Sequence, residues 1–403
     1  MNLFQFGRLI HVIYGRKGHL PDLDWIQSLG LFAVKLAQIH ALRIDFLERK
    51  KCEHLAKLYR QANEVSAEDF HRILRESSAE NFEDNFENIS QSPLATASVG
   101  QVHKATLKSG EPVVIKAVKK EVANQFRTDV SRMKGWIRFA TWVYPKLKQV
   151  GDPQGIVEDI ERFTLSELDL RHEVAGQATL REIHQEASHS FDLQGLIFPE
   201  VYSDLCQKNI MVSEYIAGPT FDELLSEGKL DYSELLHLFR LQGYYMFCKG
   251  IFHGDLHPGN IIYSDGQLCF IDTGFIAKVS KKMRVGLFEF FEALSSNDYE
   301  NSAKALNRMS EVEITGNKLQ SFTAAFIDLY REFKGATVSQ ISLTEKMMET
   351  IKLGVHSGMS FERGIFSVIR SLMYLDGMVL RCNPNAVLLE DMRPYIGEFK
   401  GFL

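Results

Sequence analysis

The sequence predicts an α+β protein of two lobes, with a helical extension before the first lobe and a helical insertion inside it. Three observations lead to this prediction. The chain has 403 residues, more than the roughly 250–300 at which one hydrophobic core stops growing. Apolar residues recur at helical spacing over most of its length. Two short stretches instead indicate β-hairpins: 99–118 alternates apolar and polar residues around a turn, and 261–272 contains two short strand-like runs joined by a two-residue turn.

The N-terminal half begins with helical sequence. Apolar residues recur every three or four positions until about residue 90. The alternating stretch 99–118 then predicts a β-hairpin around a Ser-Gly turn. Basic helical sequence extends from there to about residue 150, and a second helical stretch covers 155–187.

The C-terminal half returns briefly to strand patterns before it becomes helical. Residues 197–216 indicate strands, and the pattern from 220 onward is mostly helical. The exception is 261–272, where Asp265-Gly266 predicts a two-residue hairpin turn. We therefore expect a helical extension at 1–90, an N-terminal lobe with its helical insertion at 91–216, and a mainly helical C-terminal lobe at 217–403.

Charge and composition narrow the function classes. The net charge of −6 gives no indication of nucleic-acid binding. Charge is uneven, however: the first 21 residues contain no acid, and residues 116–150 carry nine basic residues against two acidic ones. Such faces suit either an anionic membrane surface or plain solvent. The five cysteines have no CxxC spacing and favour a reducing compartment. The amphipathic, acid-free start leaves an organelle transit segment open.

The segment FHGDLHPGNIIYSDGQLCFIDTG, residues 252–274, carries the strongest chemical signal. Asp255 is followed by Asn260 five residues later and by Asp272 after the hairpin. Phosphoryl transfer from ATP needs a positioned acceptor and a divalent metal on the phosphates. We expect Asp255 to orient or deprotonate the acceptor, and Asn260 and Asp272 to hold Mg²⁺, with Mn²⁺ as the alternative metal. Protein kinases space the same Asp and Asn identically.

Two histidines flank this aspartate. His253 is interpreted as a structural, hydrogen-bonded residue. His257 lies two positions past Asp255, where it could face the transferred phosphoryl group. No HExxH motif or Cys/His cluster predicts a zinc site.

A lysine and a loop of small residues supply the other parts of a nucleotide site. Lys116 in PVVIKAV matches the strand lysine that contacts phosphates in kinases. Upstream, small side chains would let backbone N–H groups approach anions. The nucleotide-binding candidates are Ala95, Thr96, Ala97, Ser98, Val99, Gly100, Gln101, Lys116, Glu214 and Ile216.

The lysine also needs a carboxylate partner. LSELDLRHEVAGQ offers Glu167, Asp169 and Glu173, and on a single helix Asp169 and Glu173 would share a face. This stretch lies some fifty residues past Lys116, which requires an insertion between them.

These motifs resemble the ABC1/ADCK/UbiB family of atypical kinases, also described as AarF-domain proteins, over nearly the whole chain. The resemblance implies a protein-kinase-like two-lobed fold. It matches Lys35 and Gln38 to the family's N-terminal signature, which Arg43 and Asp45 follow, and it assigns Glu173 as the partner of Lys116. Glu167 and Asp169 match the family's Glu-x-Asp pair.

The resemblance also implies an activity. Lys35, Gln38, Glu167 and Asp169 would occlude the cleft that admits peptides in protein kinases. That leaves room for a lipid-like or quinone-precursor substrate, or for ATP hydrolysis coupled to lipid extraction. A cytoplasmic protein bound peripherally to a membrane is expected, supporting ubiquinone or other isoprenoid-lipid biosynthesis within a protein complex. A mitochondrial or plastid location stays open.

The chain departs from the family pattern at three positions. Ala37 replaces a glycine, Leu256 a proline and Thr273 the phenylalanine of Asp-Phe-Gly. None of these changes removes a phosphate- or metal-binding group, so a nucleotide-competent protein is expected. Two alternatives remain: a small-molecule phosphotransferase of the aminoglycoside or choline kinase type, whose catalytic loop HGDLHPGN also resembles, and a nucleotide-binding pseudokinase scaffold.

Overall fold

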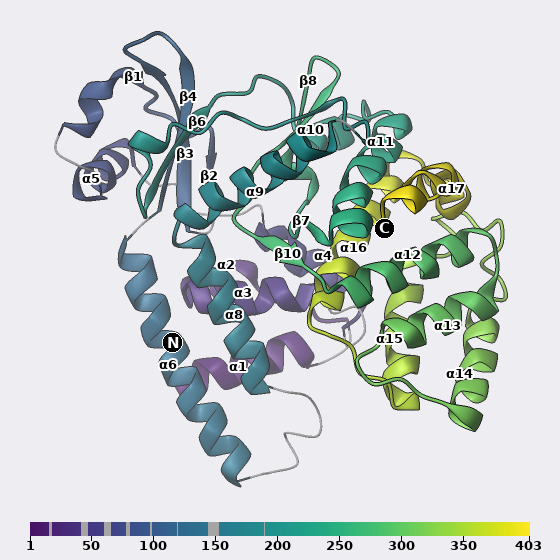
Figure 1. Cartoon of the computed structure of the whole chain (residues 1–403). Helices are drawn as coiled ribbons and strands as arrows, with labels where there is room; N and C mark the ends of the chain where they lie inside the picture. The colour runs from purple at the N-terminus through teal and green to yellow at the C-terminus, as the bar shows by residue number, and fades with distance from the viewer. Residues whose placement is uncertain are drawn as a thin grey trace. The chain divides into compact units, whose positions relative to one another are not determined.

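The computed structural model describes residues 1–15, 18–41, 47–59, 66–77, 81–96, 99–118, 120–143, 153–188 and 190–403. The chain forms two compact units. The first comprises Met1–Ala175 and Pro199–Tyr215, and the second comprises Gly176–Phe198 and Ile216–Leu403. Helices and strands occur in both units, which confirms the predicted α+β class (Figure 1). The three-part division at residues 90 and 216 stays a prediction.

The first unit begins with the expected helices. They are α1 (Leu3–Tyr14), α2 (Leu23–Ser28), α3 (Leu31–Ala41), α4 (Arg49–Ala56) and α5 (Ala67–Ser77), with 3₁₀ turns at Lys57–Tyr59 and Phe82–Asn85. Asn2 and Gln5 form a capping box at the start of α1, which satisfies backbone N–H groups that a helix leaves unpaired. Ala37, at the signature position, is fully buried in the apolar cluster around α3.

The sheet of the first unit has the order β1-β3-β4-β6, and β2 pairs with β3. Its strands are β1 (Phe86–Ile89), β2 (Ala95–Thr96), β3 (Gly100–Leu107), β4 (Pro112–Val118) and β6 (Ile210–Glu214). The antiparallel β3–β4 register confirms the predicted hairpin, and Gly110 adopts the positive φ of 100° that its turn requires. The expectation that helix continues to residue 90 is wrong at β1, because Phe86 is buried and pairs with Leu107.

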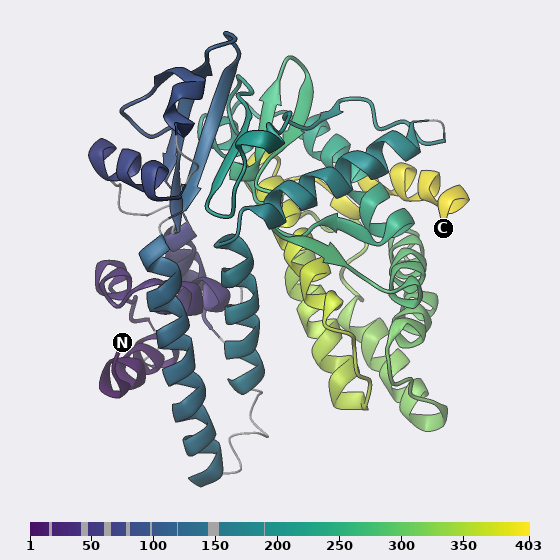
Figure 2. The same cartoon turned by 60° about the vertical axis from the view of Figure 1, so that its left-hand side comes forward.

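The described part of the insertion after β4 contains α6 (Lys120–Val143) and α8 (Pro153–Glu167), which lie side by side (Figure 2). The rest of the predicted basic helix, to residue 150, lies outside the described residues. The helical stretch predicted over 155–187 is confirmed but divided into two helices, because the chain breaks between α8 and α9 (Arg171–Ala187). Leu168 and Leu170 are both buried, and the Leu170 N–H donates to the Lys208 carbonyl instead of to a helical one.

The second unit is mainly helical, as predicted. Its helices are α10 (Phe221–Ser226), α11 (Tyr232–Gly243), α12 (Lys281–Ser295), α13 (Tyr299–Met309), α14 (Gly316–Leu329), α15 (Leu343–Ser357), α16 (Gly364–Cys382) and α17 (Leu388–Phe399), with a π turn at Tyr244–Lys249 and 3₁₀ turns at Pro258–Asn260 and Lys400–Phe402. One apolar cluster rich in aromatic side chains forms its core. No described helix combines the length and apolar character that crossing a membrane requires.

Two small sheets interrupt these helices. One has the order β5-β9-β8, and the other pairs β7 with β10. Their strands are β5 (Leu196–Ile197), β7 (Ile251–His253), β8 (Ile261–Ser264), β9 (Gln267–Phe270) and β10 (Ile276–Lys278). Asp265 and Gly266 have φ of 50° and 79°, as a type I′ turn requires, which confirms the predicted hairpin. The short β7–β10 pair was not predicted.

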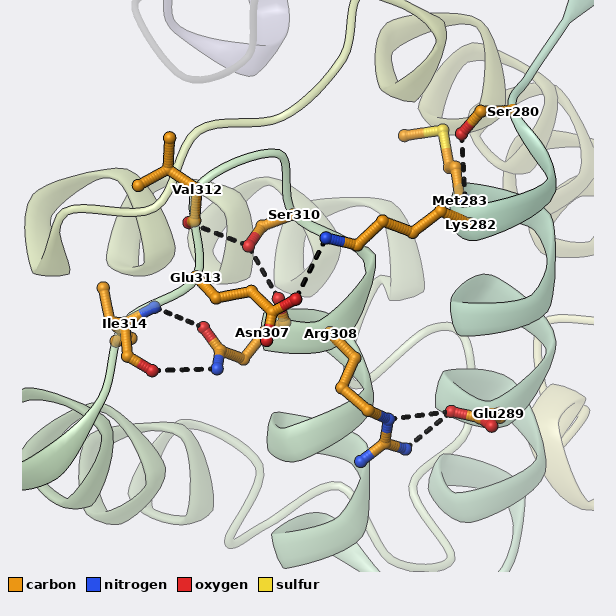
Figure 3. A network of polar contacts seen from close by, with 10 residues as sticks. All are labelled: Ser280, Lys282, Met283, Glu289, Asn307, Arg308, Ser310, Val312, Glu313 and Ile314. Carbon is orange, nitrogen blue, oxygen red and sulfur yellow. Dashed lines mark hydrogen bonds and ion pairs between the residues drawn. The ribbon is translucent and has the colours of Figure 1, made fainter.

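A polar network fixes the end of α13 (Figure 3). The Asn307 amide donates to the Ile314 carbonyl (3.0 Å) and accepts from the Ile314 N–H (2.9 Å), so one side chain replaces a backbone pair. The neighbouring Arg308 donates to the Glu289 carboxylate on α12 (2.6 Å). This network satisfies buried polar groups where the helix ends, which stabilises the helical scaffold of the second unit.

Candidate active site

The second unit brings Asp255, Asn260 and Asp272 together through its backbone. The β8–β9 register continues for one more pair, because the Ile271 N–H donates to the Asn260 carbonyl (3.1 Å). Asp272 therefore directly follows the partner of Asn260. At the other end, the Asn260 Nδ2 donates to the Asp255 carbonyl (3.0 Å). The hairpin thus joins the two segments as the spacing predicted.

The buried His253 side chain links the backbone next to Asp272 with the backbone of Asp255. It is fully buried; its Nε2 donates to the Ile271 carbonyl (3.0 Å), and its Nδ1 accepts from the Asp255 N–H (3.2 Å). Burial lowers the pKa of His253, although the Ile271 carbonyl and the carboxylates of Asp255 and Asp272 oppose the shift. A neutral ring with its proton on Nε2 satisfies both bonds. The interpretation of His253 as a structural, hydrogen-bonded residue agrees with these contacts.

The Asp255 carboxylate has two partners on α16. The Tyr374 hydroxyl donates to Oδ1 (2.7 Å), and an Arg370 guanidinium nitrogen lies 3.9 Å from the same oxygen. Burial alone would raise the pKa of Asp255, but His257, Arg370 and the Tyr374 bond outweigh it, so the pKa is lowered and the carboxylate stays ionised. The sequence analysis missed both partners, because they lie over a hundred residues away and belong to no motif.

The side chains of Asp272 and Asn260 carry the oxygen atoms that are candidate metal ligands. Asp272 is exposed and adopts a left-handed conformation with φ of 54°, which is uncommon for a residue other than glycine and is concentrated at functional sites. Asn260 is buried, and because its Nδ2 is committed to the Asp255 carbonyl, its Oδ1 is the atom available as a metal ligand.

A glycine in α9 packs against the segment that follows Asp272. A Cβ on Gly176 would lie only 2.1 Å from the Thr273 carbonyl oxygen, so the close approach requires glycine. Thr273 itself is buried. The sequence analysis missed Gly176, although the glycine inside a helical pattern was a signal that could have indicated a close contact.

His257 lies at the start of the 3₁₀ turn at Pro258–Asn260. Its Nδ1 accepts from the Gly259 N–H (3.1 Å), and its ring meets the Tyr374 ring edge-on at 6.0 Å between centroids. These contacts fix the ring, and a role toward a phosphoryl group stays a prediction.

The first unit contains the predicted lysine–carboxylate pair. Lys116 on β4 and Glu173 in the first turn of α9 form an ion pair with 2.6 Å between Nζ and Oε2. Their side chains are only 15% and 9% exposed. Of the three candidate carboxylates, the structure therefore pairs Glu173 with Lys116, as the family resemblance implied.

The other two carboxylates have different partners. Glu167 pairs with Lys35 at 2.5 Å. The Asp169 carboxylate accepts hydrogen bonds from two guanidinium nitrogens of Arg171, at 2.8 and 2.6 Å. This pairing lowers the pKa of Asp169. Because the helix breaks here, Asp169 does not share a helical face with Glu173, and that expectation is wrong.

Three further residues belong to the N-terminal signature or follow it: Gln38, Arg43 and Asp45. Gln38 is buried and donates to the Leu58 carbonyl (3.0 Å). Arg43 and Asp45 lie outside the described residues.

The predicted nucleotide loop begins in β2 and ends in β3, two strands that pair antiparallel. Ala95 and Thr96 form β2, whereas Ala97 and Ser98 lie outside the described residues. A Cβ on Gly100 would lie 2.2 Å from the Ala117 carbonyl oxygen, so strand packing alone requires this glycine.

The neighbouring side chains are turned inward. Val99 is buried, and so is Gln101, which hydrogen bonds to His103 (3.2 Å). Any contact of Val99 or Gln101 with phosphate therefore depends on backbone groups. Glu214, at the end of β6, accepts from the Glu200 N–H (3.0 Å), and Ile216 is half-buried.

Comparisons with known proteins show which family the chain resembles. The model of the ABC1 atypical kinase-like domain matches residues 57–306, more than half of the chain. The chain is 28% identical over 386 residues to a probable protein kinase UbiB of Sodalis glossinidius and 26% identical over 393 residues to one of Glaesserella parasuis, with 93% of this chain and 69% of each relative covered. An uncharacterized protein from the hydrogenase 1 5′ region of Clostridium pasteurianum is 23% identical, with 92% of this chain and 69% of the relative covered.

A solved structure shows the same fold. The complex of Rv3197 with erythromycin from Mycobacterium tuberculosis matches with a TM-score of 0.55 and 21% identity, covering 89% of this chain and 93% of that one. The predicted kinase-like fold class is thus confirmed. From the domain match and these relatives we conclude that the chain belongs to the ABC1 atypical kinase-like family.

Proposed function

We propose that this protein is a Mg²⁺-dependent phosphotransferase or ATPase of the ABC1/UbiB type, which supports ubiquinone or other isoprenoid-lipid biosynthesis at a membrane surface. One observation carries the proposal. The β8–β9 hairpin places Asp272 directly after Ile271, the backbone partner of Asn260, and the Asn260 side chain donates a hydrogen bond to the Asp255 carbonyl. This is the arrangement that a metal-bound nucleotide and an acceptor require.

The donor set fits Mg²⁺. It consists of the Asn260 amide oxygen and the Asp272 carboxylate, both hard oxygen ligands. In the described part of the chain, no group of three or more His, Cys, Asp or Glu side chains has the arrangement to hold a metal ion by itself. Mg²⁺ usually takes only one or two protein oxygens and completes its shell with water and substrate phosphates, so two ligands suffice. When bound, the ion neutralises charge on the phosphates of ATP, and Mn²⁺ would accept the same ligands.

The other residues position the reactants. Asp255, kept ionised by its neighbours, would orient the acceptor hydroxyl or water and accept its proton. Lys116, held by Glu173, would contact the phosphates of ATP. Backbone groups of residues 95–101, together with Glu214 and Ile216, complete the proposed nucleotide-binding set.

The acceptor is proposed to be a small or lipid-like molecule, in the class of quinone precursors. The Lys35–Glu167 ion pair supports this, because it ties the signature helix α3 to the end of α8 within the first unit. We propose that Lys35, Gln38, Glu167 and Asp169 exclude peptide substrates. The name UbiB carried by several relatives supports the choice of pathway.

The N-terminal helix supports docking on anionic lipid. Helix α1 contains no acidic residue, and it exposes 59% of Leu3 and 81% of Phe4. Exposed apolar side chains beside basic residues are typical of helices that lie in a membrane interface. We propose that the protein associates peripherally with a membrane, either on its cytoplasmic side or inside an organelle. We also propose that it acts there as part of a lipid-biosynthesis complex.

Vesicle co-sedimentation tests this docking. Wild-type protein should sediment with phosphatidylglycerol vesicles more than with phosphatidylcholine vesicles, and Phe4→Ser should weaken the binding. Leu94→Ser is the matched control, since Leu94 is also exposed but lies outside α1. Equally weak binding to both lipids would contradict the docking hypothesis.

The function itself is tested by ATPase assays of the purified protein with and without anionic lipid and quinone-precursor-like phenols. Mg²⁺-dependent turnover that lipid or phenol stimulates is the expected result. Phosphate transfer to a soluble alcohol would instead favour the small-molecule phosphotransferase. Nucleotide binding without turnover under every condition would favour the pseudokinase scaffold.

A further inference from the structure

Helix α16 presents two polar side chains to the proposed base. Arg370 and Tyr374 are four positions apart, so they lie on one face of the helix. Both contact Oδ1 of Asp255: the Tyr374 hydroxyl at 2.7 Å and the Arg370 guanidinium at 3.9 Å. The same oxygen therefore receives a charge-assisted hydrogen bond and a nearby positive charge.

The second carboxylate oxygen of Asp255, Oδ2, has different surroundings from Oδ1. Oδ2 accepts no hydrogen bond from any residue that the structure describes, and 29% of the side chain is exposed. A carboxylate held at one oxygen has a fixed plane, and its other oxygen points in a defined direction. This is the geometry that a residue orienting an acceptor needs, because small displacements of a catalytic group cost large factors in rate.

The two side chains of α16 also touch the surroundings of the base. The Tyr374 ring meets the His257 ring edge-on, and the Arg370 guanidinium lies 5.6 Å from the Phe275 ring centroid. These contacts limit the rotation of both side chains. Helix α16 therefore braces the catalytic loop and also the segment after Asp272, within the second unit.

We infer that Tyr374 and Arg370 are positioning residues, which hold Oδ1 of Asp255 so that Oδ2 faces the acceptor. The inference rests on the proposed function, because it gives Asp255 its role in orienting the acceptor. It assigns part of the catalytic apparatus to a helix far from every motif in the sequence.

The second unit offers a matched control. The Tyr232 hydroxyl donates to Oδ2 of Asp391 at 2.8 Å, a bond of the same kind and length between α11 and α17. Tyr232→Phe removes one Tyr–Asp bond without touching the catalytic loop. Comparing it with Tyr374→Phe separates a loss of positioning from a general loss of stability.

The experiment measures kcat and the KM for ATP, with melting temperatures, for Tyr374→Phe, Arg370→Gln, Tyr232→Phe and Asp255→Asn. We expect Tyr374→Phe to lower kcat by about tenfold or more while the KM for ATP changes less than twofold, since binding is kept and only orientation is lost. Arg370→Gln should act in the same direction and provides a second test if Tyr374→Phe folds poorly. Tyr232→Phe should leave kcat unchanged.

A double-mutant cycle completes the test. If Tyr374 acts through Asp255, Tyr374→Phe should have no further effect on residual turnover in the Asp255→Asn background. The inference is overturned if Tyr374→Phe and Tyr232→Phe have equal kcat while Asp255→Asn has lost most of its turnover, and the proposed function then stands. If Asp255→Asn keeps the wild-type kcat, or the wild type has no turnover, the proposed function fails and the inference fails with it.

Discussion

The two units of this protein carry different parts of the predicted catalytic set, and they assemble them in different ways. In the second unit, Asp255, Asn260 and Asp272 come together within one short stretch, through a hairpin and hydrogen bonds to its backbone. In the first unit, Lys116 and Glu173 are 57 residues apart and meet through one ion pair. The first assembly depends on local backbone geometry, whereas the second depends on the packing of a strand and a helix.

This difference has a physical consequence. A group built on a β-hairpin keeps its geometry when one side chain changes, because the backbone bonds remain. A largely buried ion pair loses its geometry when either partner is removed, and the remaining partner is left with an uncompensated charge. Substitutions of the catalytic side chains in the second unit should therefore lower the rate alone, whereas substitutions of Lys116 or Glu173 in the first unit should also disturb the local structure.

The largest effect is expected for Asp272→Asn. We expect a loss of roughly a thousandfold or more in Mg²⁺-ATP turnover, because several kcal/mol of charge stabilisation depend on metal binding. Steady-state ATPase kinetics measure it. Asp265→Asn is the control, since Asp265 is in the same hairpin at the turn and asparagine tolerates its positive φ. Undiminished turnover of Asp272→Asn would remove Asp272 from the site.

A smaller loss is expected for Lys116→Ala. Removing one preorganised cation from the phosphates should lower the rate by about a hundredfold. Lys108→Ala, in the turn after β3, is the control because Lys108 is exposed. A twofold loss for Lys116→Ala would reduce the lysine to a structural role.

Glu173→Gln sharpens the comparison between the units. It keeps Lys116 but removes the carboxylate that orients it, so we expect roughly a tenfold loss of rate together with a lower melting temperature. Both quantities are measured on the same preparation. A loss of rate without any change in melting temperature would contradict the view that the ion pair also supports the first unit.

The smallest effect on rate is expected for Gly176→Ala, which acts on packing. The added Cβ would lie 2.1 Å from the Thr273 carbonyl oxygen, and we expect a cost of about 1–3 kcal/mol in the free energy of unfolding. Urea unfolding measures this cost. Gly397→Ala in α17 is the control, since nothing lies within 4 Å of its added Cβ. Equal stability of the two variants would show that α9 tolerates a displacement here.

Much of this site could be predicted because its signals are local. The alternating strands, the Asp265-Gly266 turn and the five-residue spacing of Asp255 and Asn260 depend on short-range geometry that the sequence records directly. The partner of Lys116 could not be chosen from the residues alone, because three carboxylates competed, and the resemblance to a family was needed to select Glu173.

The rest depends on tertiary contacts that leave no local pattern. Tyr374 and Arg370 belong to an ordinary amphipathic helix, and only the folded chain shows that they reach Asp255. The break at Leu168–Leu170 was missed because helical periodicity continues on both sides, and tertiary burial of two leucines ends the helix. Strand β1 was missed because it is short and pairs with a distant strand.

The most direct test of the account is binding of Mn²⁺–ATP followed by electron paramagnetic resonance. If Asn260 and Asp272 hold the metal on a bound nucleotide, wild-type protein should convert the free Mn²⁺–ATP signal to a bound one, and so should Asp265→Asn. Asp272→Asn should lose that conversion. A bound signal of equal size in Asp272→Asn would contradict the central claim that the hairpin builds the metal site.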